Sequence, residues 1–370
     1  MASSTGQPSA GDHAEFETRR QVVSRGLADR KVDALLVSFG PNLRYLSGFT
    51  GSNGSLLVLP DRAILFTDPR YTIQSHQESA CTVKISKRAI TEDILATIGR
   101  LKLRRVGFEP ARMTFDFHEK LKSKLPIRAS LVPTAGWIEE LRSVKSPEEI
   151  ARIRVSVQTN SRAFEQTARS VRPGMREHDL AAELDYQLRR LGAEKNSFET
   201  IVAAGVRSAL PHAQPTSAKI NRGDLVVVDM GAIQEGYCSD MTRMLFLGSP
   251  SPKVKRTYRA VLEAQLAAIH TVRAGVSSVR VDAAARNVLK SYGLDKAFVH
   301  STGHGLGLEI HEQPRIARRD KRRLEAGMAI TIEPGVYLEN FGGIRIEDTV
   351  VVTETGCEIL TPTSKDLRVI

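Results

Sequence analysis

The order of apolar and polar positions predicts a mixed helix-and-strand region in the first part of the chain. Two apolar segments of strand length flank the turn signal Pro60-Asp61-Arg62, and a third precedes them. Helical periodicity appears over residues 94–103 and near 117–125. The three strand-length segments are residues 33–38, 55–59 and 63–67. These patterns predict a small α/β domain over residues 16–141.

A helix start marks the beginning of a second region. Ser146 fits the N-cap of a helix, Pro147 its first position, and Glu149 the second partner of a capping box. A long helix is therefore expected from Pro147, ending before Pro173-Gly174. Its buried face is expected to hold Ile150, Ile153 and Val157.

The second domain, residues 146–370, is predicted to combine helices with an antiparallel sheet. Gly192 and Gly293 are expected to end the first and last of three further helices. The helices are predicted at 177–191, 253–273 and 279–292, and the strands at 199–204, 225–230, 237–246, 328–337 and 343–352.

Length and composition are those of a globular protein with more than one domain. The chain has 370 residues, of which 41% are hydrophobic and 26% charged. Residues 1–15 are polar and lack an apolar core, which predicts a disordered tail and not a signal peptide. No apolar run approaches the ~20 residues of a membrane span. Three widely spaced cysteines (Cys81, Cys238, Cys357) favour reduced thiols in the cytoplasm.

The formal net charge of +11 raises the question of a nucleic-acid partner. The densest basic run, residues 318–323, contains no aromatic residue, and aromatics are only 5% of the chain. Single-strand binders interleave cations with stacking rings, so we expect no nucleic-acid partner. A solvated basic face is favoured, and attraction of anionic peptide termini is the functional alternative.

Two pairs of acids are placed symmetrically about predicted hairpin turns. Asp229 and Asp240 are equidistant from the turn signal Gln234-Glu235-Gly236, and Glu333 and Glu347 are equidistant from Asn340. Residues equidistant from a turn face each other, and like charges placed there repel unless a cation lies between them. With His304 added, four carboxylates and one imidazole balance the charge of two divalent cations.

This ligand set is oxygen-rich and suits Mn²⁺ first, with Co²⁺, Fe²⁺ or Zn²⁺ as alternatives. Two such ions can activate a water and polarise a carbonyl, so hydrolysis of an amide or phosphate ester is the expected chemistry. His212, His300 and His311 are each more often structural when taken singly. Beside a metal cluster, they become candidates to stabilise an oxyanion or protonate a leaving nitrogen.

Competing motifs do not fit. The glycines at 303, 305 and 307 lack the spacing of a phosphate loop. His311-Glu312 is not part of an HExxH helix, because residue 315 is arginine. Cys238 has no CxxC partner and is interpreted as a packed thiol.

Taken together, the ligand motifs resemble those of the M24 "pita-bread" metallopeptidases, and within them the Xaa-Pro branch of prolidase and aminopeptidase P. The resemblance rests on Asp229-x10-Asp240, His304-Gly305-x-Gly307, Ile332-Glu333-Pro334-Gly335 and Arg345-Ile346-Glu347-Asp348. It covers residues from about 147 to 365. Residues 42–49 resemble part of the creatinase-type N-terminal domain. The implied fold is an α/β creatinase-type domain followed by an α+β pita-bread domain with a curved antiparallel sheet.

The resemblance also implies roles for the site residues. Asp229 would chelate one metal, His304 and Glu333 the other, and Asp240 and Glu347 would bridge both. Glu333 would also shuttle a proton. The remaining implied roles are oxyanion stabilisation by His212 and His311, a proline pocket at His300, and support by Arg345.

The implied activity is hydrolysis of the Xaa-Pro bond at the N-terminus of short proline-containing peptides, in a homodimer. Arg315 resembles the arginine with which prolidases hold the proline carboxylate, although a surface arginine is an equal alternative. Xaa-Pro dipeptidase is slightly favoured, and Xaa-Pro aminopeptidase is the alternative. The rivals are methionine aminopeptidase or creatinase chemistry and a non-catalytic peptide- or nucleic-acid-binding module on the same fold.

Overall fold

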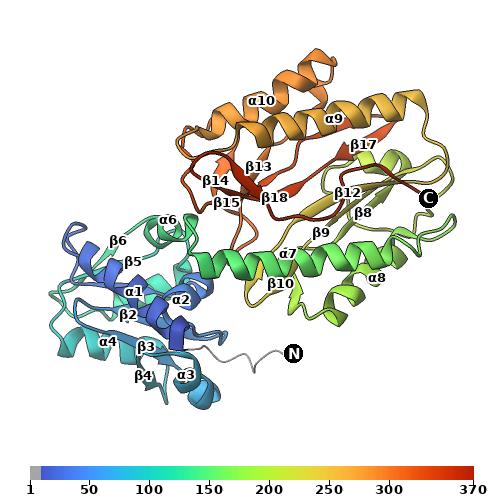
Figure 1. Cartoon of the computed structure of the whole chain (residues 1–370). Helices are drawn as coiled ribbons and strands as arrows, with labels where there is room; N and C mark the ends of the chain where they lie inside the picture. Colours follow the sequence, from blue (N-terminus) through green and yellow to red (C-terminus); the bar gives the residue numbers. More distant parts are fainter. Residues whose placement is uncertain (1–9) are drawn as a thin grey trace. The chain divides into compact units, whose positions relative to one another are not determined.

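The computed structural model describes residues 10–370, which divide into two compact units (Figure 1). One unit extends to Leu141 and the other runs from Arg142 to Ile370. Part of the predicted disordered tail, residues 1–9, lies outside the described residues. The prediction is wrong for residues 10–15, which begin helix α1 (Ala10–Gly26). This segment is helical because Glu15 pairs with Arg19 one turn later, and Phe16 is buried beside them.

The first unit is built on a six-stranded mixed sheet with the order β4-β3-β2-β1-β5-β6. Strand β1 pairs antiparallel with β2 but parallel with β5. The strands are β1 (Ala34–Val37), β2 (Gly54–Val58), β3 (Ala63–Thr67), β4 (Thr82–Ile85), β5 (Arg105–Phe108) and β6 (Ser130–Pro133). The helices after α1 are α2 (Gly40–Ser47), α3 (Thr72–Glu78), α4 (Ile90–Arg100), α5 (Phe115–Ser123) and α6 (Trp137–Ser143). The predicted strands and both predicted helices of this region are confirmed.

The second unit begins with the predicted long helix, α7 (Pro147–Thr167). Its capping box is complete: Ser146 Oγ accepts from the Glu149 N–H at 3.2 Å, and the Glu149 carboxylate accepts from the Ser146 N–H at 3.1 Å. The other predicted helices are present as α8 (Glu177–Arg190), α9 (Pro252–Thr271) and α10 (Ser278–Ser291). Across residues 10–370, no helix combines the length and hydropathy needed to cross a bilayer.

The strands of the second unit form sheets ordered β11-β10-β7, β20-β12-β9-β8, β14-β13-β15-β18-β19 and β16-β17. All of these pairings are antiparallel except that of β12 with β20. The strands are β7 (Lys195–Asn196), β8 (Ile201–Ala204), β9 (Leu225–Met230), β10 (Ala232–Gln234), β11 (Tyr237–Cys238), β12 (Met241–Phe246), β13 (Gly303–Gly305), β14 (Glu312–Ile316), β15 (Ala329–Ile332), β16 (Gly335–Leu338), β17 (Gly342–Arg345), β18 (Asp348–Val352), β19 (Cys357–Ile359) and β20 (Arg368–Val369). This architecture confirms the predicted fold class.

Helices cover both faces of the central strands in this unit. Figure 1 shows α9 and α10 on one side and α7 and α8 on the other. Alternate residues of β9 serve the two cores: Val227 packs in the cluster with α9 and α10, whereas Val226 and Val228 pack in the cluster with α7 and α8. Every position of β9 is buried for this reason.

Three of the predicted long strands are interrupted, and each interruption falls on a candidate ligand. Asp240 lies between β11 and β12, Glu333 between β15 and β16, and Glu347 between β17 and β18. The strand ladder therefore opens where the acids lie.

Next to Glu347, a buried ion-pair network ties strands to the C-terminal segment. The Asp348 carboxylate accepts from Arg243 at 2.8 Å, Lys365 at 2.6 Å and Gln265 at 2.8 Å. Arg243 also donates to the main-chain oxygens of Glu347 and Thr363. The Asp348 side chain is 0% exposed, so its charge depends on these partners.

Asp348→Asn is expected to lower the free energy of unfolding of this unit by about 3 kcal/mol, because Arg243 and Lys365 lose a buried counter-charge. Chemical denaturation followed by circular dichroism measures the change. The matched control is Glu358→Gln, which breaks the exposed pair with Arg154 (2.8 Å) and is expected to cost less than about 1 kcal/mol. Equal losses in the two variants would contradict the assignment.

Candidate metal centre

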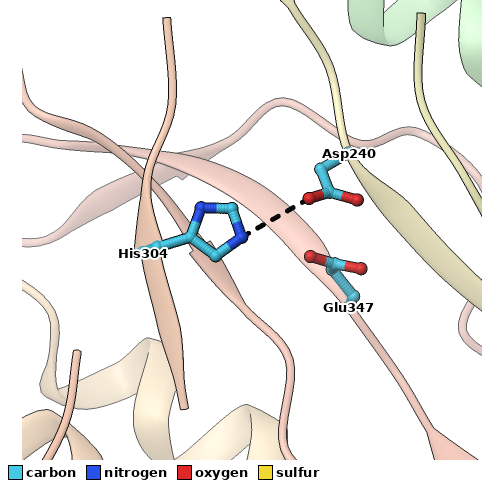
Figure 2. A group of neighbouring side chains, drawn as sticks. All are labelled: Asp240, His304 and Glu347. Atoms are coloured by element: carbon cyan, nitrogen blue, oxygen red, sulfur yellow. Dashed lines mark ion pairs between the residues drawn. The ribbon is translucent and has the colours of Figure 1, made fainter. Parts of the chain in front are cut away.

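Three buried side chains from separate segments of the second unit converge on one point. Asp240, His304 and Glu347 each offer a ligand atom, and these atoms lie within 4.8 Å of one another (Figure 2). Figure 2 shows one ring nitrogen of His304 directed at Asp240, with the Glu347 carboxylate alongside. His304 Nε2 lies 3.5 Å from Asp240 Oδ2 and 3.4 Å from Glu333 Oε1. The arrangement therefore brings a fourth predicted ligand, Glu333, to the same point.

The predicted register of the first acidic pair is wrong by two residues. Asp229 of β9 pairs with Thr242 of β12, so Asp240 lies diagonally across from Asp229. The hairpin closes on Gln234 and Tyr237, leaving a two-residue turn in which both residues have positive φ (51° and 79°). That turn places the centre of the hairpin one residue later than the turn signal suggested. The two acids nevertheless interact, since Asp229 contributes to the raised pKa of Asp240.

The register of the second acidic pair is confirmed. Strand β15 aligns Ile332 with Asp348, and the pairing of β16 with β17 continues the same register. Glu333 and Glu347 therefore face each other across the gap between the two ladders. The turn between them contains Asn340 at φ 59°.

His304 is held with Nε2 facing the acids. Its Nδ1 lies 3.0 Å from the Gly305 carbonyl oxygen, an acceptor that fixes the proton on Nδ1 and leaves the Nε2 lone pair free. The flanking glycines let β13 fit between its neighbours. A Cβ at Gly303 would overlap the Thr331 carbonyl oxygen, and one at Gly305 would overlap that of Gln313. Close backbone approach thus explains these glycines without a phosphate ligand.

The electrostatics of the pocket favour a cation. Burial, with the charges of Asp229 and Glu333, raises the pKa of Asp240 well above its usual value. Burial also raises the pKa of Glu333 and of Glu347. Asp229 Oδ1 and Glu347 Oε1 are buried without a hydrogen-bond partner in the described part of the chain. Unpaired buried carboxylate oxygens are costly, so this donor set fits a divalent metal ion.

Arg345 orients two of the carboxylates, one directly and one through Thr242. Its Nη2 donates to Asp229 Oδ2 at 2.6 Å, and its Nε donates to Thr242 Oγ at 3.0 Å. Thr242 in turn donates to Glu347 Oε2 at 2.7 Å. One guanidinium orients two of the four acids but carries only one positive charge. Arg345 therefore compensates only part of the charge that the four acids carry when they are ionised.

Two of the predicted histidines lie beside this cluster. The His311 ring packs edge-on against His304 with 4.4 Å between centroids. His300 Nε2 accepts from the Tyr337 hydroxyl at 2.9 Å, while its Nδ1 faces the Ser301 carbonyl at 2.8 Å. Burial lowers the pKa of His300 to about 4. His311 is more exposed, and partial burial together with the neighbouring His304 lowers its pKa to about 4, so both rings are neutral at pH 7. His212 is exposed.

Arg315, the candidate for substrate binding, is exposed on β14. It pairs directly with His304 across the β13–β14 ladder, so both side chains leave the sheet on the same face. Cys238 is buried, and burial raises the pKa of its thiol, which agrees with a packed thiol.

Two functional neighbours were not singled out in the sequence. Tyr337 accepts from Arg345 Nη1 at 2.5 Å and links it to His300, and burial raises its pKa to about 12. Glu312, adjacent to His311, binds Arg142 at 2.5 Å and Lys145 at 3.1 Å. Burial raises the pKa of Glu312, but Lys145 and Arg142 outweigh it and hold the pKa below its usual value. Tyr337 lies on β16, four residues after Glu333, so it could have been sought on the same face of the chain. No local sequence signal marks Glu312.

Comparison with known families agrees with both units. Residues 151–354 match metallopeptidase family M24, and residues 19–144 match the creatinase/prolidase N-terminal domain. The resemblance inferred from the ligand motifs is thereby confirmed.

Individual relatives match over nearly the whole chain. The chain is 37% identical over 337 residues to the Xaa-Pro dipeptidase of Pyrococcus horikoshii, spanning 91% of this chain and 94% of that protein. The structure of an Xaa-Pro dipeptidase from Bacillus anthracis superposes with a TM-score of 0.93 at 36% identity, covering 96% of this chain and 100% of that one. The X-Pro aminopeptidase from Thermotoga maritima gives a TM-score of 0.89 at 37% identity, covering 94% and 100%. The chain belongs to metallopeptidase family M24 and carries a creatinase/prolidase N-terminal domain.

Proposed function

We propose that this metallopeptidase hydrolyses the Xaa-Pro bond at the N-terminus of short peptides, using two divalent metal ions. The observation that carries the proposal is the convergence of Asp240, His304 and Glu347 at one buried point, with the Glu333 carboxylate 3.4 Å from His304 Nε2. Relatives named Xaa-Pro dipeptidase and X-Pro aminopeptidase support the choice of substrate. Cytoplasmic location and homodimer assembly stay predictions.

Asp229, Asp240 and Glu347 would hold one ion, and Asp240, Glu347, His304 and Glu333 the other. Two divalent ions balance the four acidic charges, and Mn²⁺ suits this oxygen-rich set best. When bound, such ions supply a nucleophilic hydroxide at neutral pH and polarise the substrate carbonyl. The unpaired oxygens of Asp229 and Glu347 are the observation that supports this ligand assignment.

The surrounding groups are suited to move protons and stabilise charge. The pKa of Glu333 is raised by burial, which fits a carboxylate that accepts a proton and releases it to the leaving nitrogen. Neutral His311, with His212 nearby, can donate an N–H to the developing oxyanion. Arg345 fixes the carboxylate of Asp229 and the hydroxyl of Tyr337. The resulting role of Arg345 is positioning.

Recognition of proline is assigned to the side of the site that holds His300 and Arg315. The Xaa-Pro bond lacks an N–H, so a site cannot use that donor and must recognise the proline ring and the group attached to its carbonyl. His300 and Tyr337 contribute aromatic surface, with ring centroids 5.5 Å apart. Arg315 would bind the free carboxylate of a dipeptide. Xaa-Pro dipeptidase activity is therefore the first candidate.

Xaa-Pro aminopeptidase activity on longer peptides is the second candidate. A cavity of about 860 Å³ borders both His300 and Arg315 and continues along residues 317–321. A proline side chain and carboxylate do not fill such a volume. Residues on the C-terminal side of the proline could occupy the remainder.

The rival functions are less well supported. Methionine aminopeptidases generally lack the N-terminal domain matched at residues 19–144, and creatinase-like proteins lack the complete ligand set. A metal-free binding module has no use for four buried acids. A measurement of metal binding distinguishes the two hypotheses, because only the proposed metallopeptidase requires bound ions.

Asp240→Asn and Glu347→Gln are each expected to abolish binding of at least one of two metal equivalents, because each removes a carboxylate that would help to hold both ions. Isothermal titration of metal-free protein with Mn²⁺ measures the stoichiometry. Glu358→Gln, an exposed carboxylate outside the site, is the control and should bind as the wild type does. Unchanged stoichiometry in both site variants, or no binding by the wild type, would refute the assignment.

The His300 ring is expected to stay neutral until about pH 4, because burial lowers its pKa. As pH falls from about 6.5 towards 4, the unfolded chain gains a proton that the folded one does not, so up to about 3 kcal/mol of stability is lost. Proton NMR of the Cε1–H resonance, assigned with His300→Asn, monitors the titration. A midpoint near the usual value of about 6.5 would show that the ring is not buried in solution.

Arg315→Ala is expected to raise KM for Ala-Pro at least about tenfold, because the guanidinium would bind the proline carboxylate. KM for Ala-Pro-Ala should change much less. Steady-state kinetics of metal-loaded enzyme compare the two substrates, with the exposed Arg259→Ala as the control. Equal effects on both peptides would remove Arg315 from carboxylate binding. If the metal-loaded wild type cleaves neither peptide, the proposed function fails.

A further inference from the structure

The cavity beside the metal centre has an excess of positive charge. Arg315, Arg318, Arg319 and Lys321 line it, together with one acid, Asp320. Arg318, Arg319 and Lys321 are exposed, and none of the four cationic side chains forms an ion pair within residues 10–370. The cavity therefore gathers positive charges that no ion pair within residues 10–370 neutralises.

The single acid does not neutralise these cations. Asp320 Oδ2 accepts from the Arg315 N–H at 3.1 Å, and Oδ1 accepts from the Arg322 N–H at 2.9 Å. Asp320 thus holds the turn between β14 and the next loop. Another lining residue, Arg286, is bound to Asp282 at 2.7 Å and donates to the main-chain oxygen of His300. Asp320 and Arg286 are therefore held in place by their hydrogen bonds, whereas the side chains of Arg318, Arg319 and Lys321 are exposed.

The cavity is continuous with the proposed proline side of the site. His300 lines it and is linked through Tyr337 to Arg345, which binds Asp229. Arg315 lines it too and is the strand partner of His304. A peptide with its scissile bond at the metals and its proline at His300 would place its next residue among these cations.

We propose that this basic cavity binds an acidic side chain on the residue after the proline, so that the substrate class is peptides of the form Xaa-Pro-Glu or Xaa-Pro-Asp. The inference rests on the proposed Xaa-Pro hydrolysis, and within it on the second candidate, aminopeptidase activity on longer peptides. Exposed cations attract an anionic group over a distance of about 10 Å at moderate ionic strength and raise its local concentration. The cavity would thereby select among peptides that share the same N-terminal half.

A peptide fits this cavity better than a nucleic acid. Phe298, the phenylalanine in its lining, is 3% exposed and lies beneath Arg286, whose guanidinium carbon is 4.1 Å from the ring centroid. It presents no free face on which a base could stack. His300 also lines the cavity, so a peptide whose proline lies at His300 would reach these cations with its next residue.

The first test compares Ala-Pro-Glu-NH2 with the isosteric neutral Ala-Pro-Gln-NH2 on metal-loaded enzyme. The terminal amide removes the second carboxylate, so the comparison isolates the side chain. The ratio of kcat/KM values is expected to favour Glu about fivefold at low salt and to approach one at about 0.5 M NaCl. A ratio near one at low salt would overturn the inference.

The triple variant Arg318→Ala, Arg319→Ala, Lys321→Ala is expected to bring the Glu/Gln ratio close to one. The matched control is Lys255→Ala, Arg256→Ala, Arg259→Ala, which removes the same charges from the exposed face of α9 and should keep the wild-type ratio. If both variants lower the Glu/Gln ratio equally, the preference reflects the net charge of the protein, and the inference of a specific site is overturned.

Two outcomes separate this inference from the proposed function. Cleavage of Ala-Pro without cleavage of either tripeptide amide overturns the inference and leaves Xaa-Pro hydrolysis intact. If no prolyl peptide is cleaved, the proposed function fails. Fluorescence anisotropy with labelled Glu and Gln peptides then tests binding to the basic cavity independently of cleavage. The inference is supported if the wild type binds the Glu peptide more tightly than the Gln peptide and the Arg318/Arg319/Lys321 triple variant does not. Equal binding of the two peptides by the wild type overturns it. Displacement of the Glu peptide by single-stranded DNA at equal charge concentration would reassign the cavity to nucleic acid.

Discussion

The repulsion among four carboxylates in one buried pocket is the constraint on which the rest of the second unit depends. Asp229, Asp240, Glu333 and Glu347 lie within a few side-chain lengths of one another. Among residues 10–370, only Arg345 adds a permanent positive charge in direct contact with them. Packing forces alone would not retain such a group, because each buried charge costs several kcal/mol unless it is compensated. Metal binding and folding of this region would therefore be coupled, because ions that neutralise the acids would also stabilise the strands that carry them.

The sequence determines how the acids meet through strand register, which explains both the successful and the failed predictions. Glu333 and Glu347 are placed correctly because the hairpin around Asn340 is symmetric. Asp229 and Asp240 are displaced by two positions because a two-residue turn with positive φ sets the register, and turn composition alone did not locate its centre. A shift of two residues preserves the face of the strand, whereas a shift of one would have turned Asp240 away from the pocket. The proximity of these acids was predictable for that reason, although the strand register that brings Asp229 and Asp240 together was not.

Contacts between residues far apart in sequence could not be predicted in the same way. Arg142 and Glu312 are separated by 170 positions, and neither lies in a motif that marks the other. Their ion pair buries a charge next to His311 and anchors the start of β14. The glycines of β13 are similar: their spacing does not fit a phosphate loop, and the sequence alone offered no other reason for them. The folded sheet supplies that reason, which is the close approach of β14 and β15. Local signals such as the Ser146 capping box, by contrast, were interpreted correctly because both partners lie within one turn of helix.

The distribution of charge over the second unit links the buried acids to the basic residues outside them. The chain has 53 basic and 42 acidic residues, and the four acids of the pocket are the ones that bound cations would neutralise. Bound metal ions would therefore make the field around the site more positive. The cavity that shares His300 with the site is lined by Arg315, Arg318, Arg319 and Lys321. An anionic group leaving water for this cavity gains from the metals and the cations together, whereas a cationic group is opposed by both. Discrimination by charge would then act before any contact with the proline ring, and it would weaken with salt, because screening affects the exposed cations more than the buried acids.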